Sequence, residues 1–158
     1  MSDAIRIREA DERDRDFILS LTPRFVSFEL PKGRSKPQVQ AAIHADIEHA
    51  WQESAPGDHF FVAEDRAARP TGFLHVQVQR DFFSGARACH VSDLAVAPGY
   101  DGRGIGAALL AHAEAWAVAH RCRLLTLSVF PANSRAQAFY TRAGFVPDLL
   151  RMSKPLKK

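Results

Sequence analysis

Hydrophobic and polar positions follow two different periods along this chain of 158 residues. Alternation with period two predicts strands, and apolar residues three or four positions apart predict helices. Strands are expected at residues 4–10, 58–65, 71–83, 86–97, 123–130 and 146–156. Helices are expected at residues 11–28, where Pro23 interrupts the pattern, and at residues 38–54, 105–120 and 133–145. Successive strands followed by a strand, helix, strand unit predict an α+β fold on a sheet of mixed direction.

The composition indicates a single globular domain over residues 1–158. Hydrophobic residues make up 46% of the chain, and a chain of this length buries roughly two thirds of its unfolded surface. The net charge of +3 comes from scattered residues, and no apolar run has the length of a membrane span. We therefore expect neither nucleic acid nor a membrane as a partner. The two cysteines, Cys89 and Cys122, favour a reducing, cytoplasmic location.

Three glycines occupy every second position just before the helix expected from residue 105, namely Gly102, Gly104 and Gly106. Glycine has no Cβ, so backbone N–H groups can approach a ligand closely, and a helix start adds partial positive charge. With Arg103 between the glycines, the pattern favours a phosphate site over an ordinary turn. The dinucleotide fingerprint fits poorly, because no acidic residue follows about twenty positions later. The phosphate loop of NTPases fits poorly too, because no Gly-Lys-Ser/Thr follows.

Two motifs together resemble the GNAT superfamily of acetyl-CoA-dependent N-acetyltransferases. The first is LAVAPGYDGRGIGAALL, in which a strand ends at Val96 and Pro98 and a glycine loop opens a helix. The second is NSRAQAFYTRAGF, which carries Asn133, Ala136, Phe139, Tyr140, Gly144 and Phe145. The order of the expected elements matches this superfamily over essentially the whole chain.

The resemblance implies a fold, a cosubstrate and a reaction. The fold is a central mixed, mainly antiparallel, splayed sheet of about six or seven strands flanked by about four helices. The cosubstrate is acetyl-CoA, and the acceptor is a primary amine of a small molecule or peptide. A homodimer is compatible with the resemblance. The alternative is a non-catalytic relative that binds acyl-CoA as a sensor or structural module.

The resemblance also implies where acetyl-CoA binds. The strand at residues 94–96 would pair with the pantetheine arm, and the glycine loop would bind the pyrophosphate. Asp101 stands where the family usually carries Arg or Gln, so backbone N–H groups and Arg103 would have to carry the pyrophosphate contact. The expected cofactor-binding residues are Leu94, Ala95, Val96, Asp101, Gly102, Arg103, Gly104, Ile105, Gly106, Ala107, Ser128, Asn133, Ala136 and Tyr140.

Acetyl transfer to an amine needs a base for the ammonium, a donor for the oxyanion and an acid for the departing thiolate. Tyr140 stands where the family places its acid. The Glu that relatives use as a base is absent at Ser92 and near His90. His90 is therefore the first candidate and Asp93 the second, although strand parity would turn Asp93 away; a water chain is a further possibility.

Two local features stay open on the sequence alone. His90, Ser92 and Asp93 break strict alternation, as a β-bulge would, and a solvated edge strand fits equally well. The segments 28–38 and 80–87 are expected to wall the acceptor site, and their mostly basic balance leans towards an amine that also carries an anionic group. No metal is expected, because no histidine pair shows the i, i+4 zinc spacing with an acid between.

Overall fold

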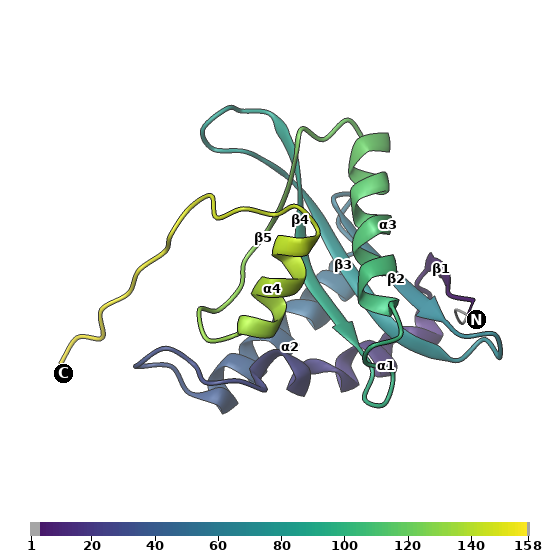
Figure 1. Cartoon of the computed structure of the whole chain (residues 1–158), viewed down its shortest axis with the longest axis horizontal. Helices are drawn as coiled ribbons and strands as arrows, with labels where there is room; N and C mark the ends of the chain where they lie inside the picture. Colours follow the sequence, from purple (N-terminus) through teal and green to yellow (C-terminus); the bar gives the residue numbers. More distant parts are fainter. Residues whose placement is uncertain (1–3, 158) are drawn as a thin grey trace.

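The computed structural model describes residues 4–157, which form one five-stranded sheet with helices on both faces (Figure 1). The strands follow one another across the sheet in chain order. Their bounds are β1 (Arg6–Glu9), β2 (Asp58–Glu64), β3 (Pro70–Arg80), β4 (Arg87–Val96) and β5 (Leu124–Leu127). Neighbouring strands are antiparallel except β4 and β5, which are parallel. This is the mixed, mainly antiparallel α+β fold that the sequence predicts.

Four α-helices cover the sheet. Their bounds are α1 (Arg15–Ser20), α2 (Lys36–Glu53), α3 (Ile105–Ala119) and α4 (Ser134–Arg142), and two short 3-10 helices, η1 (Glu12–Asp14) and η2 (Thr22–Val26), flank α1. The long helix expected at residues 11–28 is thus three short pieces. Pro23 lies in the first turn of η2, a place where its missing N–H does no harm.

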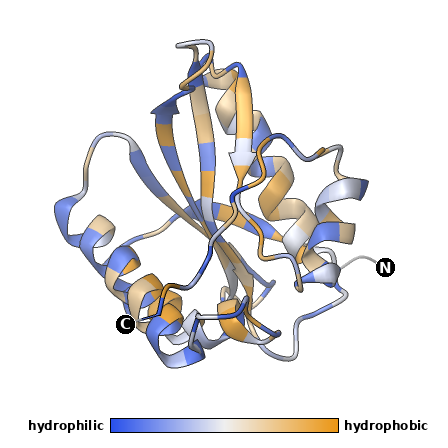
Figure 2. Cartoon of the chain, turned by 90° about the vertical axis from the view of Figure 1, so that its left-hand side faces the viewer, coloured by the Kyte–Doolittle hydropathy of each residue, from blue (hydrophilic) through white to orange (hydrophobic). Residues whose placement is uncertain are grey.

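Each face of the sheet has its own apolar core, as expected for strands that alternate between two covered faces (Figure 2). Leu74, Val76 and Val91 pack against Leu109 of α3. On the opposite face, the core joins strand residues to α1 and α2 and consists of Ile18, Leu21, Ile47, Val62, Phe73, Ala95 and Ala97. None of the helices in the described part of the chain combines the length and apolar character of a membrane span.

The sheet has five strands instead of six or seven, because residues 146–156 form no strand. This segment leaves the body after α4 as an irregular, extended chain (Figure 1). Pro147 and Pro155 have no N–H to donate to a strand ladder, which weakens pairing at both ends. Its apolar side chains are consequently exposed, and they are Val146, Leu149, Leu150, Met152 and Leu156.

The sheet splays between β4 and β5. Leu124–Leu127 of β5 pairs only with residues 88–91, the first half of β4. Beyond Val91, β4 keeps β3 as a partner on one side and has no strand partner among the described residues on the other. A row of backbone groups on β4 is therefore open to a ligand.

Candidate active site

A β-bulge lies where β4 loses its second partner. His75 of β3 pairs with Asp93, but the next residue, Val76, pairs with Val91, so Ser92 is an extra residue. The sequence left this bulge and a regular edge strand as alternatives, and the register decides for the bulge.

The bulge changes which side chains share a face. His90 pairs with Gln77, and Asp93 pairs with His75, two positions further along β3. Residues two apart on a strand point to the same face, so His90 and Asp93 lie on one face, the one covered by α1 and α2. The expectation that strand parity turns Asp93 away is therefore wrong, because the extra residue restores the parity.

His90 is held by its register partner on β5. Its Nδ1 lies 2.8 Å from Oγ1 of Thr126 on β5, and burial lowers the pKa of the imidazole. Ser92 is occupied differently, since its hydroxyl donates a 2.9 Å hydrogen bond to Oε1 of Gln77. A neutral imidazole with one ring nitrogen engaged can accept a proton at the other, so His90 is suited to act as a base.

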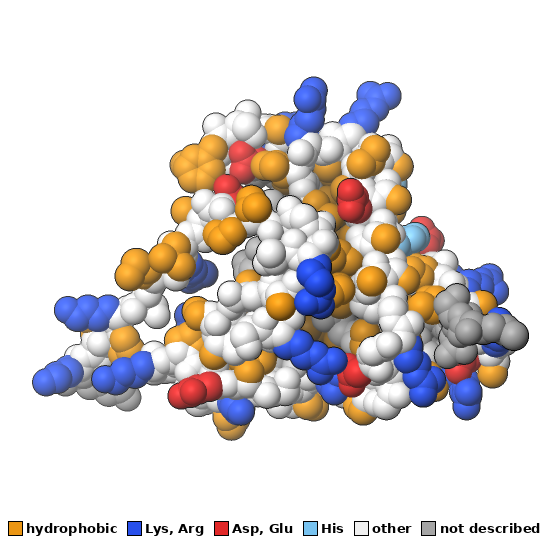
Figure 3. Space-filling model, in the orientation of Figure 1, with side chains coloured by type: hydrophobic (Ala, Val, Ile, Leu, Met, Phe, Trp, Pro, Cys, Tyr) orange, Lys and Arg blue, Asp and Glu red, His pale blue; other side chains and the backbone are white. Residues whose placement is uncertain are grey.

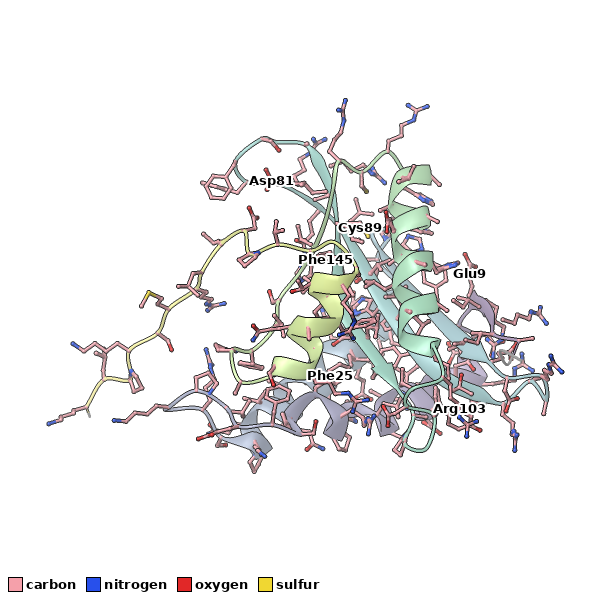
Figure 4. The ribbon with its side chains drawn as sticks, in the orientation of Figure 1. Glu9, Phe25, Asp81, Cys89, Arg103 and Phe145 are labelled. Carbon is pink, nitrogen blue, oxygen red and sulfur yellow. The ribbon has the colours of Figure 1, made fainter. Side chains whose placement is uncertain are left out.

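Tyr140 comes from α4, on the opposite face of the sheet. Its ring lies 5.2 Å from that of Phe139 and 5.8 Å from that of Phe145, centroid to centroid (Phe145 is labelled in Figure 4). Burial raises the pKa of the phenol, which keeps the proton on Tyr140 at neutral pH. A phenol that stays protonated is able to act as a proton donor.

Asn133 and Ala136 are joined by the cap of α4. The Asn133 side chain accepts a hydrogen bond from the Ala136 N–H at 3.3 Å. Gln137 reaches back to the carbonyls of Phe130 and Pro131. Ser128 is exposed just beyond the end of β5. The contacts of Asn133 and Gln137 fix the start of α4, and Asn133 and Ala136 stay predicted ligand-binding residues.

The glycine loop leaves the start of α3 free of side-chain caps. Gly102 and Gly104 have φ of 76° and 80°, the left-handed region that glycine tolerates, and a Cβ at either position would meet no atom within 4 Å. Gly104 is the N-cap of α3, so no side chain satisfies the first N–H groups of the helix. A Cβ on Gly106 would lie 3.6 Å from Phe139 Cζ and 3.8 Å from Val96 Cγ2, which places the helix start beside α4 and β4. The residues present fit a phosphate group.

Asp101 is paired with cations from other elements. Its Oδ1 lies 2.7 Å from Nη2 of Arg24 in η2 and 3.7 Å from Nη2 of Arg135 in α4. Arg103 lies over the Tyr100 ring, 5.1 Å from its centroid. Basic side chains accordingly surround the loop before α3 (Figures 3 and 4). The sequence could not reveal the Arg24 pair, because Arg24 and Asp101 are 77 positions apart.

The two segments expected to wall the acceptor site behave differently. Phe28, from the loop before α2, lies 5.8 Å from the Phe130 ring just after β5, so this loop reaches the splay. The segment 80–87 forms the tip of the β3–β4 hairpin, with Asp81 at the opposite end of the molecule from Arg103 in Figure 4. Only the first segment is brought to the site.

Within residues 4–157, no group of three His, Cys, Asp or Glu side chains has the arrangement of a metal site.

The chain is similar to known acetyltransferases. The model of the acetyltransferase (GNAT) family matches residues 26–145. A putative acetyl transferase from Pyrococcus furiosus superposes with a TM-score of 0.76 at 24% identity, over 97% of this chain and 100% of that one. The aminoglycoside N-acetyltransferase AAC(6')-Iy in complex with CoA superposes with a TM-score of 0.69 at 20% identity, over 100% of this chain and 97% of that one. Glucosamine-6-phosphate N-acetyltransferase from Arabidopsis thaliana superposes with a TM-score of 0.67 at 15% identity, over 98% of this chain and 100% of that one.

Proposed function

The chain belongs to the GNAT acetyltransferase family and is an acyltransferase with acetyl-CoA as cosubstrate, and we propose that it acetylates a primary amine of a small molecule or peptide. The observation that carries this proposal is the unpaired half of β4 beside an uncapped helix start. A pantetheine arm can pair with the strand, while the phosphates meet the N–H groups of α3. We take the chain to work as one domain in the cytoplasm, which its two free cysteines support.

In the proposed reaction the amine attacks the thioester directly. His90 takes one proton from the ammonium, and the neutral nitrogen then adds to the carbonyl carbon. A backbone N–H of residues 94–96 donates to the oxyanion. As the C–S bond breaks, Tyr140 protonates the thiolate, and the nitrogen loses its second proton. The balance is an amide, CoA with a free thiol, and one proton released.

The base assignment predicts a pH effect. An ordinary histidine has a pKa of about 6.5. Burial lowers the pKa of His90, so its neutral form appears at a lower pH than that of an ordinary histidine. We expect kcat to rise with pH through an inflection below that value. His90→Gln should abolish the inflection and lower kcat about tenfold, with water relaying the remaining proton transfer. An unchanged pH profile in His90→Gln would assign the base to another group.

The loop contacts predict a salt-sensitive effect on binding. Arg24 neutralises Asp101 beside the phosphate site, so Arg24→Gln should weaken acetyl-CoA binding about fivefold at low salt. The difference in affinity should shrink at 1 M salt, where the Debye length is about 3 Å and charges further apart are screened from one another. Titration calorimetry measures both values, and Arg13→Gln is the control because Arg13 pairs locally with Asp11. Equal affinity for wild type and Arg24→Gln at low salt would contradict this role.

Calorimetry with acetyl-CoA and CoA, with NAD and ATP as controls, tests the function first. Binding of the CoA forms justifies an amine screen by thiol release, and absence of binding would mean that Asp101 has disabled the loop. Binding without turnover on any amine would favour a non-catalytic acyl-CoA sensor. In the screen, the exposed Lys32, Arg34 and Lys36, from the same loop as Phe28, favour acceptors that also carry a carboxylate. Polyamines outperforming every carboxylate-bearing amine would overturn that preference.

A further inference from the structure

Three ionisable side chains form a chain across the sheet next to the bulge. His75 of β3 lies between Asp58 of β2 and Asp93 of β4. Its Nε2 is 2.7 Å from Asp58 Oδ1, and its Nδ1 is 2.9 Å from Asp93 Oδ2. The His75 side chain is 0% exposed, and those of Asp58 and Asp93 are 14% and 8% exposed. Phe60 stacks on the imidazole with its ring centroid 4.1 Å away and the two planes 5° apart.

The geometry favours a charged imidazole. Both ring nitrogens face carboxylate oxygens, and an ionised carboxylate can only accept hydrogen bonds. Burial alone would lower the pKa of His75, but the hydrogen bonds and charges of Asp93 and Asp58 raise it overall. One imidazolium between two carboxylates leaves one net negative charge. Buried charges are unfavourable unless they are paired, so a further cation would stabilise the excess carboxylate.

The excess charge lies at the open half of β4. Asp93 directly follows the bulge residue Ser92 and shares a face with His90. Among the described residues its hydrogen bond is made by Oδ2, and Oδ1 has no donor. Asp46 of α2 is the other carboxylate near enough to act on Asp93, and it adds further negative potential. An ammonium group is the donor that suits both the free oxygen and the charge.

We propose that Asp93 binds the ammonium group of the acceptor through Oδ1, and that His75 and Asp58 are positioning residues that hold the Asp93 carboxylate in place. This inference rests on the proposed acetyl transfer and names the acceptor as an amine that arrives protonated. The ammonium then lies on the same face as His90, which takes its proton. Burial raises the pKa of Asp93, whereas the hydrogen bond and charge of His75 favour its ionised form. The ammonium of the acceptor would favour that form further, in which Asp93 supplies orientation and charge.

Two substitutions at position 75 separate the two hydrogen bonds. The amide nitrogen of asparagine can occupy the place of Nδ1 and keep the bond to Asp93. The amide nitrogen of glutamine can occupy the place of Nε2 and keep the bond to Asp58. Because only the Asp93 bond matters for the acceptor, we expect His75→Asn to keep kcat/KM for the amine within about threefold. His75→Gln should lower it about 20-fold, mainly through a higher KM.

The melting temperature and the acetyl-CoA affinity of each variant are measured alongside the kinetics. We expect both variants to melt at similar temperatures and to bind acetyl-CoA as the wild type does. His59→Gln is the matched control, because His59 lies outside the Asp58–His75–Asp93 hydrogen bonds: its Nε2 lies 3.1 Å from the Pro56 carbonyl. Equal losses of kcat/KM in His75→Asn and His75→Gln would overturn the proposal and leave a purely structural role. Failure of the proposed function is distinguishable, since the wild type would then acetylate no amine.

Discussion

Replacing Tyr140 by phenylalanine is expected to lower kcat about 100-fold or more, while the Kd for acetyl-CoA changes less than about twofold. Burial keeps the phenol protonated, so in the wild type a proton is available when the thiolate departs. Phenylalanine preserves the ring contacts with Phe139 and Phe145 and removes only the hydroxyl. The loss should therefore appear in the chemical step and not in binding or folding.

Thiol release in a single turnover measures that step without interference from product release. Tyr100→Phe is the matched control, because Tyr100 is the other tyrosine of the chain. Arg103 lies over its ring, which phenylalanine keeps. The control should keep the wild-type rate. A Tyr140→Phe rate within threefold of the wild type would show that solvent or another group protonates the thiolate.

Replacing Gly104 by valine is expected to weaken acetyl-CoA binding about 50-fold or more. The N-cap of α3 has φ of 80°. Any residue with a Cβ is disfavoured in this left-handed region by about 1–2 kcal/mol, and a β-branched residue such as valine is disfavoured further. The loop would turn away from this conformation, and the N–H groups at the helix start would no longer converge on one phosphate. Losing even one hydrogen bond to a charged group adds about 1.5–3 kcal/mol.

Gly85→Val separates the loss of the site from the strain itself. Gly85 lies at the tip of the β3–β4 hairpin with φ of 69°, and like Gly104 it has open space around its missing Cβ. Both variants should lose similar thermal stability, but Gly85→Val should bind acetyl-CoA with the wild-type Kd in calorimetry. If Gly104→Val also kept the wild-type Kd, the start of α3 would not be the phosphate site.

The sequence predicted those helices and strands in which the buried residues repeat with the period of a helix or a strand. Residues 86–97 and 105–120 were expected as a strand and a helix, and the structure has β4 at Arg87–Val96 and α3 at Ile105–Ala119. The prediction failed at residues 146–156, which were expected to form a final strand. A strand also needs a partner with free backbone groups, and two prolines limit what this segment can offer.

The candidate site was predictable only where local sequence determines it. The glycine loop and Tyr140 are recognisable from contiguous motifs, because turn conformation and helix position depend on neighbouring residues. The roles of His75 and Asp58 were missed, since His75 occurs within an apolar strand and its partners come from two other strands. The signal was present as a single histidine at an inward position of β3, but only the sheet register connects it to Asp93.

The unpaired half of β4 also bears on how the protein behaves between catalytic cycles. An open strand edge with free N–H and C=O groups is a template for association with another chain. The arm of the cosubstrate would cover this edge, so occupancy would protect the protein from self-association as well as supply the acetyl group. At a ligand concentration 100 times Kd, binding to the native state adds about 2.7 kcal/mol of stability. Loss of the cosubstrate would then expose this edge again and remove that added stability.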